Sequence, residues 1–338
     1  MSVTIRDVAR LAGVSPSTVS RVLNKTAPIS EQTSNRIYRA MEELKNVPND
    51  IARSFASGSA RAIAIAINVS DARSYANSFF NNTVFGIETA AHKNGYNLII
   101  TGANCDHGGA DSLEKLIMSK KIDGLILPVS MMNASVVKLV EDSNFPFVLL
   151  GRATKLSDKI SWVDIANSQA GSNAARYLLK KGYRKIAFIS HGDKELFSRD
   201  RLEGYRTELN RAGLKPDPAY VISSSSSLDE AKLCIRALLT STSAPDAVIC
   251  GDDRMALAAL RVSGELGLRV PEDVGILCFD NTEVTELAEP SISVVDVDTF
   301  ELGRIAAETL LRRIENPNFG ANQSQITTKV IERRSTMK

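Results

Sequence analysis

Apolar residues near the start of the chain recur at the spacing of short amphipathic helices. Ile5, Val8, Ala9 and Ala12 form one apolar stripe, and Thr4 in front of it is a suitable N-cap. The pattern therefore predicts a first helix of about two turns that buries one face.

A second short helix is predicted after a glycine turn at Gly13. Ser15 is its expected N-cap, and Pro16 takes the first helical position, where a missing N–H costs nothing. Ser17 and Arg21 are four residues apart and share the solvent-facing side. The inward positions are Val19, Val22 and Leu23.

A third helix is predicted after Ser30, with its apolar stripe at Ile37, Ala40, Met41 and Leu44. Three small helices with a glycine turn and an exposed polar second helix predict a helix-turn-helix DNA-binding domain over residues 1–47. Its second helix has the size that enters a major groove.

Beyond residue 61 the pattern changes to apolar runs that alternate with helical segments. "AIAIAINV", "NLIIT", "IDGLILPV" and "FPFVLLG" predict buried strands, and the rhythm starts again near residue 160 with "WVDI" and "KIAFIS". This alternation predicts parallel sheets that are doubly wound by helices. We expect an α/β effector domain over 61–338 with two lobes and a cleft between them. The expected lobes are 61–160 plus 292–322, and 161–291 plus 323–338.

Composition and charge are consistent with a globular protein that binds nucleic acid. The 338 residues are 43% hydrophobic, and no apolar run is long enough to predict a membrane span or a secretory signal. Residues 1–60 carry eight basic against five acidic groups, a net charge of +3, although the whole chain is only +2. Four scattered cysteines fit reduced thiols, so we expect a cytoplasmic protein.

No pattern typical of an enzyme is found. The chain lacks Gly-x-Gly-x-x-Gly after its first strand, and it lacks a P-loop, a His-Glu-x-x-His motif and a Gly-x-Ser-x-Gly elbow. His92, His107 and His191 show no ligand spacing and are expected to be surface or structural residues. We therefore expect no catalytic residues, no metal and no cofactor.

"VTIRDVARLAGVSPSTVSRVLN", "ISEQTSNRIYRAMEEL", "VPNDIARSFASG" and the closing "IERRSTMK" resemble the lactose-repressor (LacI/GalR) family of bacterial transcription regulators. The resemblance spans the whole chain and implies a periplasmic-binding-protein-like (type I) body. It also implies a homodimer on a double-stranded, pseudo-palindromic DNA operator, without a membrane partner. The competing hypothesis is a free-standing binding protein or enzyme whose first helices serve assembly.

The resemblance assigns roles to residues of the first sixty. Pro16, Ser17 and Arg21 would read base edges, and Arg21 suits a bidentate contact to guanine. Residues 48–60 would form a hinge helix whose Ala52, Arg53 and Phe55 enter the minor groove, with Phe55 as the wedge. The implied phosphate contacts are Thr4, Ser15, Thr18, Asn24, Ser30 and Thr33.

The effector site is expected at the carboxyl ends of the strands, where open parallel sheets bind ligands. Asp252 and Asp253 follow the predicted strand "DAVIC", and Asp253 is expected to cap the helix after it. The Ala166-Asn167 pair departs from the family's usual Asp-Asn, so the effector cannot be copied from a relative. A sugar is favoured, whereas a purine, a nucleoside or a sugar acid remains open. The candidate effector-binding residues are Phe79, Arg152, Arg201, Asp252 and Asp280.

Overall fold

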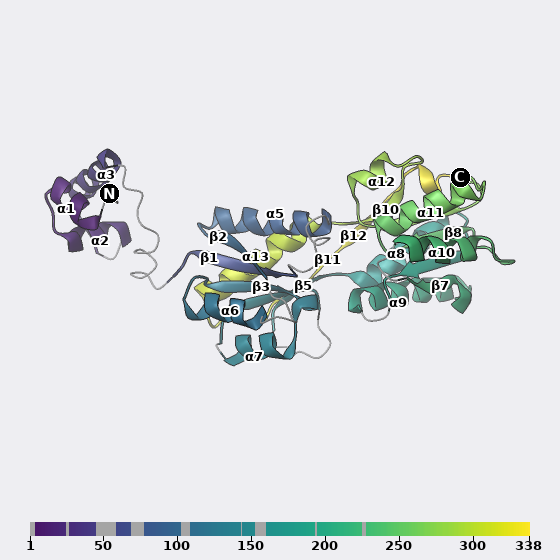
Figure 1. The fold of residues 1–338 in the computed structure, drawn as a ribbon, viewed down its shortest axis with the longest axis horizontal. Coiled ribbons are helices and arrows are strands. Elements are labelled where there is room, and N and C mark those ends of the chain that lie inside the picture. Colours follow the sequence, from purple (N-terminus) through teal and green to yellow (C-terminus); the bar gives the residue numbers. More distant parts are fainter. Residues whose placement is uncertain are drawn as a thin grey trace.

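The computed structural model describes residues 4–24, 27–44, 59–68, 78–102, 109–142, 144–152, 160–192, 195–224 and 228–338. Three short helices come first, followed by two α/β units (Figure 1). The helices are α1 (Ile5–Ala12), α2 (Pro16–Asn24) and α3 (Glu31–Glu43). This order confirms the expected helix-turn-helix domain followed by a doubly wound body.

The three helices share one small apolar core, and local sequence sets where they begin and end. Thr4 and Asp7 form the expected capping box, and Gly13 ends α1 in the left-handed conformation at φ 64°. The buried side chains come from the predicted stripes of all three helices. They are Val8, Ala9, Ala12, Val19, Val22, Ile37, Ala40 and Met41.

The first α/β unit is built on a six-stranded sheet in the order β11-β5-β4-β3-β1-β2, and every neighbouring pair is parallel. Alternate residues of β1 face its two sides. Ile63 and Ile65 contact α5 and α13, whereas Ala64 and Ala66 contact α6 and α7. The strands are β1 (Ala62–Ile67), β2 (Asn97–Gly102), β3 (Gly124–Pro128), β4 (Phe147–Leu150), β5 (Trp162–Ile165) and β11 (Gln323–Ile326). The helices are α5 (Ser78–Lys93), α6 (Gly109–Met118), α7 (Ala134–Asp142) and α13 (Thr299–Glu315).

The second unit has a six-stranded sheet in the order β12-β10-β9-β8-β6-β7, in which β12 alone runs antiparallel to its neighbour. α8 and α9 cover one face and α10 and α11 the other. The strands are β6 (Ile186–Ser190), β7 (Val221–Ser223), β8 (Ala247–Cys250), β9 (Gly275–Phe279), β10 (Ser293–Val297) and β12 (Thr328–Ile331). The helices are α8 (Asn167–Lys180), α9 (Leu196–Arg211), α10 (Leu228–Leu239), α11 (Asp253–Glu265) and α12 (Glu283–Leu287). Short 3₁₀ turns lie at Val129–Met131, Pro218–Tyr220 and Arg334–Thr336.

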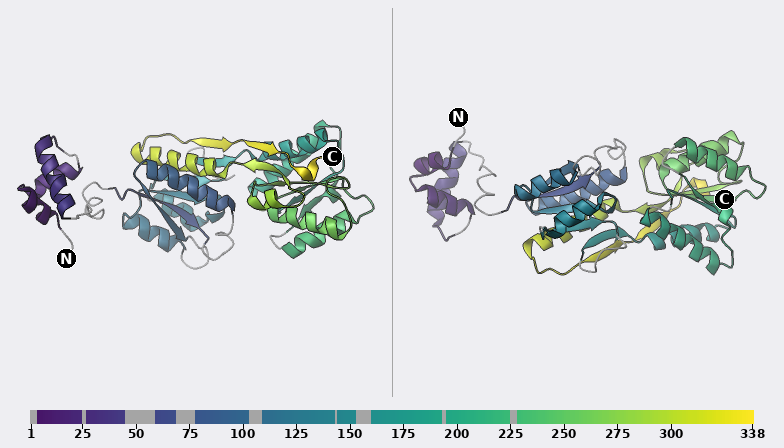
Figure 2. Two further views of the ribbon diagram at one scale, coloured as in Figure 1. Left: turned by 90° about the horizontal axis from the view of Figure 1, so that it is seen from above. Right: turned by 60° about the horizontal axis from the view of Figure 1, so that its bottom comes forward.

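The expected lobe boundaries are wrong at three strands. β5 was placed in the second lobe, but it pairs with β4 and β11 in the first sheet. β10 was placed in the first lobe, but it pairs with β9 and β12 in the second sheet, and only α13 after it returns to the first unit. β11 likewise belongs to the first sheet. The chain therefore crosses between the units near residues 166, 298 and 327, as the two views of Figure 2 also show.

Each unit contains one pair of helices that touch backbone to backbone through glycine. In the second unit, a Cβ at Gly171 would lie 1.8 Å from the carbonyl oxygen of Arg201, and one at Gly204 would lie 1.9 Å from that of Ser168. α5 and α13 meet in the same way at Gly86 and Gly303. Within the described ranges, no helix is long and apolar enough to cross a membrane.

We expect Gly204→Ala to destabilise the second unit because the added methyl group must push α8 and α9 apart. Overpacking of this kind lowers the free energy of unfolding by about 1–3 kcal/mol or more. Gly264→Ala is the matched control, because Gly264 is in α11 and an added Cβ there would meet no atom within 4 Å. The control should gain about 0.5–1 kcal/mol from helix propensity. Urea unfolding followed by circular dichroism measures both, and equal effects of the two variants would contradict the tight contact.

Candidate functional site

The second helix of the N-terminal domain presents a polar face at its N-terminal end. Pro16, Ser17 and Arg21 are exposed, whereas Val19 and Val22 are buried against α1 and α3. The helix therefore buries its apolar stripe and leaves the three residues predicted to read bases open to solvent. This is the arrangement that major-groove binding requires.

Hydroxyl groups gather at the start of α2 and of α3. The Oγ of Ser15 accepts from the backbone N–H of Thr18 at 3.2 Å and lies 2.8 Å from the hydroxyl oxygens of both Ser17 and Thr18. Before α3, the hydroxyl of Ser30 donates to the Oγ1 of Thr33 at 2.9 Å. Helix N-termini with hydroxyl side chains are suited to phosphate oxygens.

Four of the predicted DNA contacts have no described side chain. Asn24 ends α2, but its side chain lies outside the described part of the structure. Ala52, Arg53 and Phe55 lie in the segment 45–58, which is also outside the described residues. Their roles stay predictions.

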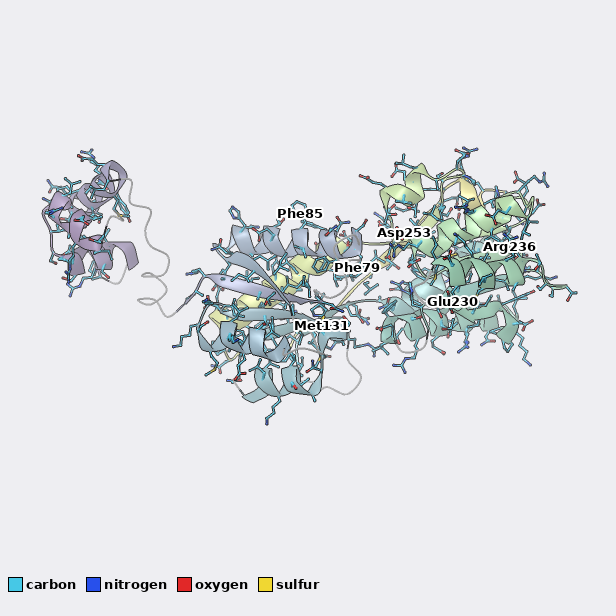
Figure 3. The ribbon with its side chains drawn as sticks, viewed as in Figure 1. Phe79, Phe85, Met131, Glu230, Arg236 and Asp253 are labelled. Atoms are coloured by element: carbon cyan, nitrogen blue, oxygen red, sulfur yellow. The ribbon has the colours of Figure 1, made fainter. Side chains whose placement is uncertain are left out.

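Polar residues at the carboxyl ends of β5, β6, β8 and β9 form the candidate effector site, which we call the cleft site. Its members lie at the end of a strand, just after one, or on the helix that follows. They are Asp164, Asn167, His191, Arg201, Asp252 and Asp280. Phe79 at the start of α5 lies at the end of the first unit that faces the second, opposite Asp253 (Figure 3).

Arg201 is the buried cation of this site, with 5% of its surface exposed. Its Nε donates to the Oδ1 of Asn167 at 3.0 Å, and its guanidinium lies 4.1 Å above the ring of Phe279. Burial lowers the pKa of Arg201, while Asp280, Asp164 and Asp252 oppose that shift. An arginine stays protonated under such conditions, so the site contains a fixed positive charge.

Asp280 is the acceptor without a partner. It follows β9 with a left-handed backbone at φ 73°, a conformation that few residues other than glycine adopt. Its Oδ1 is buried and has no hydrogen-bond partner in the described structure. Burial raises its pKa to about 6 against the pull of Arg201, and Asp253 and Asp252 raise it further. An uncompensated buried acceptor is suited to a ligand hydroxyl.

Asp252 has two partners, one of them a histidine that the sequence did not assign to the site. Its Oδ1 accepts from the backbone N–H of Met255 at 2.7 Å, and its Oδ2 lies 3.2 Å from the Nε2 of His191. Burial alone would raise the pKa of Asp252, but His191 and Met255 outweigh it and lower the pKa. Asp252, not Asp253 as expected, is therefore the cap of α11. The Oδ2 of Asp253 instead accepts from the hydroxyl of Thr282 at 2.9 Å.

Two predicted effector residues have neighbours outside this cluster. The Nη2 of Arg152 lies 2.5 Å from the Oδ2 of Asp200, on the outer side of α9. Phe79 is half-buried and packs against the apolar core of the first unit. Phe197, whose ring lies 5.3 Å from the guanidinium of Arg201, was not predicted. The position of His191 directly after β6 was the signal that could have identified it.

Comparison with known proteins identifies both parts of the chain. Residues 4–49 match the bacterial regulatory proteins of the lacI family, and residues 175–336 match the periplasmic binding protein-like domain. The HTH-type transcriptional repressor PurR of Vibrio atlanticus is 32% identical and aligns with 99% of this chain and 98% of its own length. The chain belongs to the LacI family of bacterial transcriptional regulators.

Other relatives support the same assignment. The ribose operon repressor of Haemophilus influenzae is 33% identical, with 93% of each chain covered. The solved complex of the transcriptional regulator CelR with cellobiose is 30% identical, with a TM-score of 0.74 and 98% and 99% of the two chains covered. The lac repressor dimer bound to operator shares the fold, with a TM-score of 0.85 at 24% identity over both full lengths. This LacI-family chain is a DNA-binding regulator, so the hypothesis of a free-standing binding protein or enzyme is wrong.

We expect Asp280→Asn to stabilise the regulator near pH 7. A carboxyl group whose pKa is raised on folding costs stability above its folded pKa, and this cost disappears below its unfolded pKa near 3.8. The gain should approach about 3 kcal/mol above pH 6 and vanish near pH 4. Thermal unfolding across this pH range measures it.

Asp252→Asn provides the opposite-sign comparison. The pKa of Asp252 is lowered, so its charge adds stability above pH 4, and we expect its removal to destabilise the regulator at pH 7. Equal signs for the two variants would contradict the described environments.

Proposed function

We propose that this regulator is a cytoplasmic repressor whose affinity for its operator is controlled by a small molecule bound between the two α/β units. The observation that supports it best is the cleft site. A buried guanidinium at Arg201 and a buried unpartnered oxygen on Asp280 belong to the same chain as an exposed DNA-reading helix. The N-terminal domain reads the DNA sequence, and the two α/β units respond to the ligand.

The chemistry of the cleft site favours a carbohydrate. Arg201 donates hydrogen bonds and Asp280 accepts them, and this pairing suits adjacent hydroxyl groups. The rings of Phe197 and Phe279 flank Arg201 and add apolar surface. Two relatives support a sugar by their names, the ribose operon repressor and the CelR–cellobiose complex.

We propose that a second copy of the chain covers exposed apolar side chains of both units. Phe85 of α5 is 64% exposed and contacts the ring of Phe300 at a centroid distance of 5.4 Å. Ile100 is on the edge strand β2, and Leu233 and Leu287 extend the exposed set to the second unit. Large exposed apolar residues are typical of protein interfaces. The lac repressor, whose solved structure shares this fold, is itself a dimer on its operator. A homodimer would place two reading helices on a two-fold symmetric site.

Coupling between ligand and DNA would act through the three chain crossings near residues 166, 298 and 327. A ligand held by both units favours one arrangement of the units over another. A coupling free energy of about 1–3 kcal/mol would change operator affinity by roughly 5- to 150-fold. Residues 48–60, with Ala52, Arg53 and Phe55, are proposed to carry the change to the minor groove.

Selection of bound sequences from a random DNA pool should yield a two-fold symmetric operator. On that operator, Arg21→Ala should lose about 1–3 kcal/mol of binding free energy and relax the preference at one base pair. Thr18→Ala, which removes a phosphate contact, should weaken operator and unrelated DNA alike. Fluorescence anisotropy with both DNAs distinguishes the two losses. Uniform weakening by Arg21→Ala would contradict its role in base readout.

Variants of the cleft site should bind operator normally and lose the response to effector. Ribose, maltose and cellobiose are suitable first probes, added to the protein–operator complex. Arg201→Gln should abolish the shift that the active sugar causes, because glutamine lacks the positive charge and the five-donor guanidinium group. Glu203→Gln is the control, since Glu203 is exposed on the same helix. An unchanged response in Arg201→Gln would place the effector elsewhere.

A further inference from the structure

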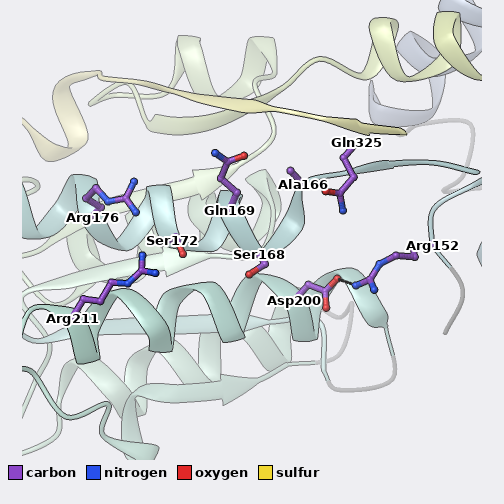
Figure 4. Close-up of a pocket in the computed structure, with 9 residues that line it drawn as sticks. All are labelled: Arg152, Ala166, Ser168, Gln169, Ser172, Arg176, Asp200, Arg211 and Gln325. Carbon is purple, nitrogen blue, oxygen red and sulfur yellow. Dashed lines mark hydrogen bonds and ion pairs between the residues drawn. The ribbon is translucent and has the colours of Figure 1, made fainter. Parts of the chain in front are cut away.

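A polar groove on the outer side of α8 and α9 has no part in the proposed function. It encloses about 500 Å³, and its lining is polar except for Ala166 (Figure 4). Arg152 and Gln325 come from the first unit, whereas α8 and α9 of the second unit supply the other side chains. The groove therefore joins both units beside two of the three crossings. We call it the hinge groove.

The α8–α9 contact lies between the hinge groove and Arg201, although Arg152 and Asp200 of the groove also interact with Asp164 of the cleft site. Asp200 and Arg201 are neighbours on α9, yet Asp200 lines the groove and Arg201 is buried with Asn167. On α8, Ser168 lines the groove, whereas its neighbour Asn167 contacts Arg201 in the cleft site. Close approach at Gly171 and Gly204 leaves no space between the helices for a ligand to pass. The two sites lie back to back.

The charge of the hinge groove is positive. Its lining contains the three arginines Arg152, Arg176 and Arg211 and the acid Asp200, and the adjoining Glu208 reduces the net charge of the group to +1. Glu208 fixes two of these arginines from below: its Oε1 and Oε2 accept from the Nε and Nη2 of Arg176 at 2.8 and 2.7 Å, and Oε2 lies 3.5 Å from the Nη1 of Arg211. The Nη1 of Arg176 also donates to the Oδ1 of Asn173 at 3.3 Å, so the second N–H of each of its terminal nitrogens and the guanidinium of Arg211 are what this pair offers a ligand.

Two further donors lie at the other end of the groove. The Nε of Arg152 is buried and has no hydrogen-bond partner in the described structure. The N-cap of α8 is Ala166, whose methyl side chain cannot accept a hydrogen bond from the first-turn N–H groups. Ser168 and Gln169 lie between the two ends (Figure 4). From Asp200 to Arg211 the groove follows α9 for about 16 Å.

We propose that the hinge groove binds a phosphorylated small molecule of the sugar phosphate class. Its phosphate contacts Arg176 and Arg211, and its hydroxyl groups run along Ser168 and Gln169 toward Arg152. Paired arginines are suited to a phosphate, and hydroxyl and amide side chains are suited to a polyol. The site is a second one, distinct from the effector cleft.

A ligand in this groove would also act on the hinge. Gln325 is on β11, just before the crossing near residue 327, and Arg152 follows β4, whereas the arginines that hold the phosphate belong to the second unit. A molecule that contacts all of them fixes the angle between the units. The groove thus offers a second input to the equilibrium that the cleft effector biases.

The test uses glucose 6-phosphate, inorganic phosphate and glucose as probes of the full-length protein without DNA, by isothermal titration calorimetry at low salt. Glucose 6-phosphate should bind, and inorganic phosphate should bind more weakly. Arg211→Gln should weaken both by about tenfold, because each loses a charged donor. Gln169→Ala should weaken glucose 6-phosphate alone. Arg206→Gln is the matched control, since Arg206 is exposed on α9 outside the groove.

Arg201→Gln distinguishes this site from the cleft. Glucose 6-phosphate affinity that is unchanged in Arg201→Gln and reduced in Arg211→Gln supports the hinge groove. Affinity lost in Arg201→Gln and kept in Arg211→Gln would place the phosphate in the cleft and overturn the proposal. Absence of binding at millimolar probe, or equal losses in Arg211→Gln and Arg206→Gln, would overturn it as well.

Discussion

Arg201 has a full positive charge with only 5% of its surface exposed, and much of the second unit is arranged around it. A buried cation is tolerated only when donors and charges are compensated. Asn167 accepts from its Nε, Phe279 lies under its guanidinium, and Asp280, Asp164 and Asp252 provide opposing charge. These groups come from both units, because Asp164 is on β5 of the first sheet and the others belong to the second unit. The packing that positions the cation therefore also positions the acids.

The α8–α9 contact makes this arrangement possible. Gly171 meets the backbone of Arg201, and Gly204 meets the backbone of Ser168, so the two helices cannot come closer together without steric clash. A side chain larger than hydrogen at either glycine would move Arg201 relative to Asn167. The guanidinium of Arg201 is closely packed on its sides. Its position is therefore determined by the backbone contact between α8 and α9 and not by rotation of a flexible side chain.

How far the sequence predicted the structure depended on the range of the interactions. The N-terminal domain was predicted residue by residue because its caps, turn and stripe are local. The strands were also found, but β5, β10 and β11 were placed in the wrong lobes because strand pairing is a long-range choice that apolar runs do not encode. In the cleft site, Asp280 directly follows β9 and Arg201 is on α9, and their roles in effector binding stay predictions. The cap of α11 was predicted at Asp253 but is Asp252. With two aspartates side by side, the sequence does not show at which of them the helix starts.

The neighbours Asp200 and Arg201 show why two sites on one helix can be linked. A helix turns about 100° per residue, so consecutive side chains reach different surfaces while sharing one backbone. Movement of α9 that adjusts Arg201 in the cleft must move Asp200 and Arg211 in the hinge groove by a comparable amount. The close contacts at Gly171 and Gly204 would couple such a movement to α8, since the two backbones already touch there. If a ligand in the proposed hinge groove shifts α9, it would alter the cleft site, and the reciprocity of linked binding would then make the coupling free energy equal in both directions.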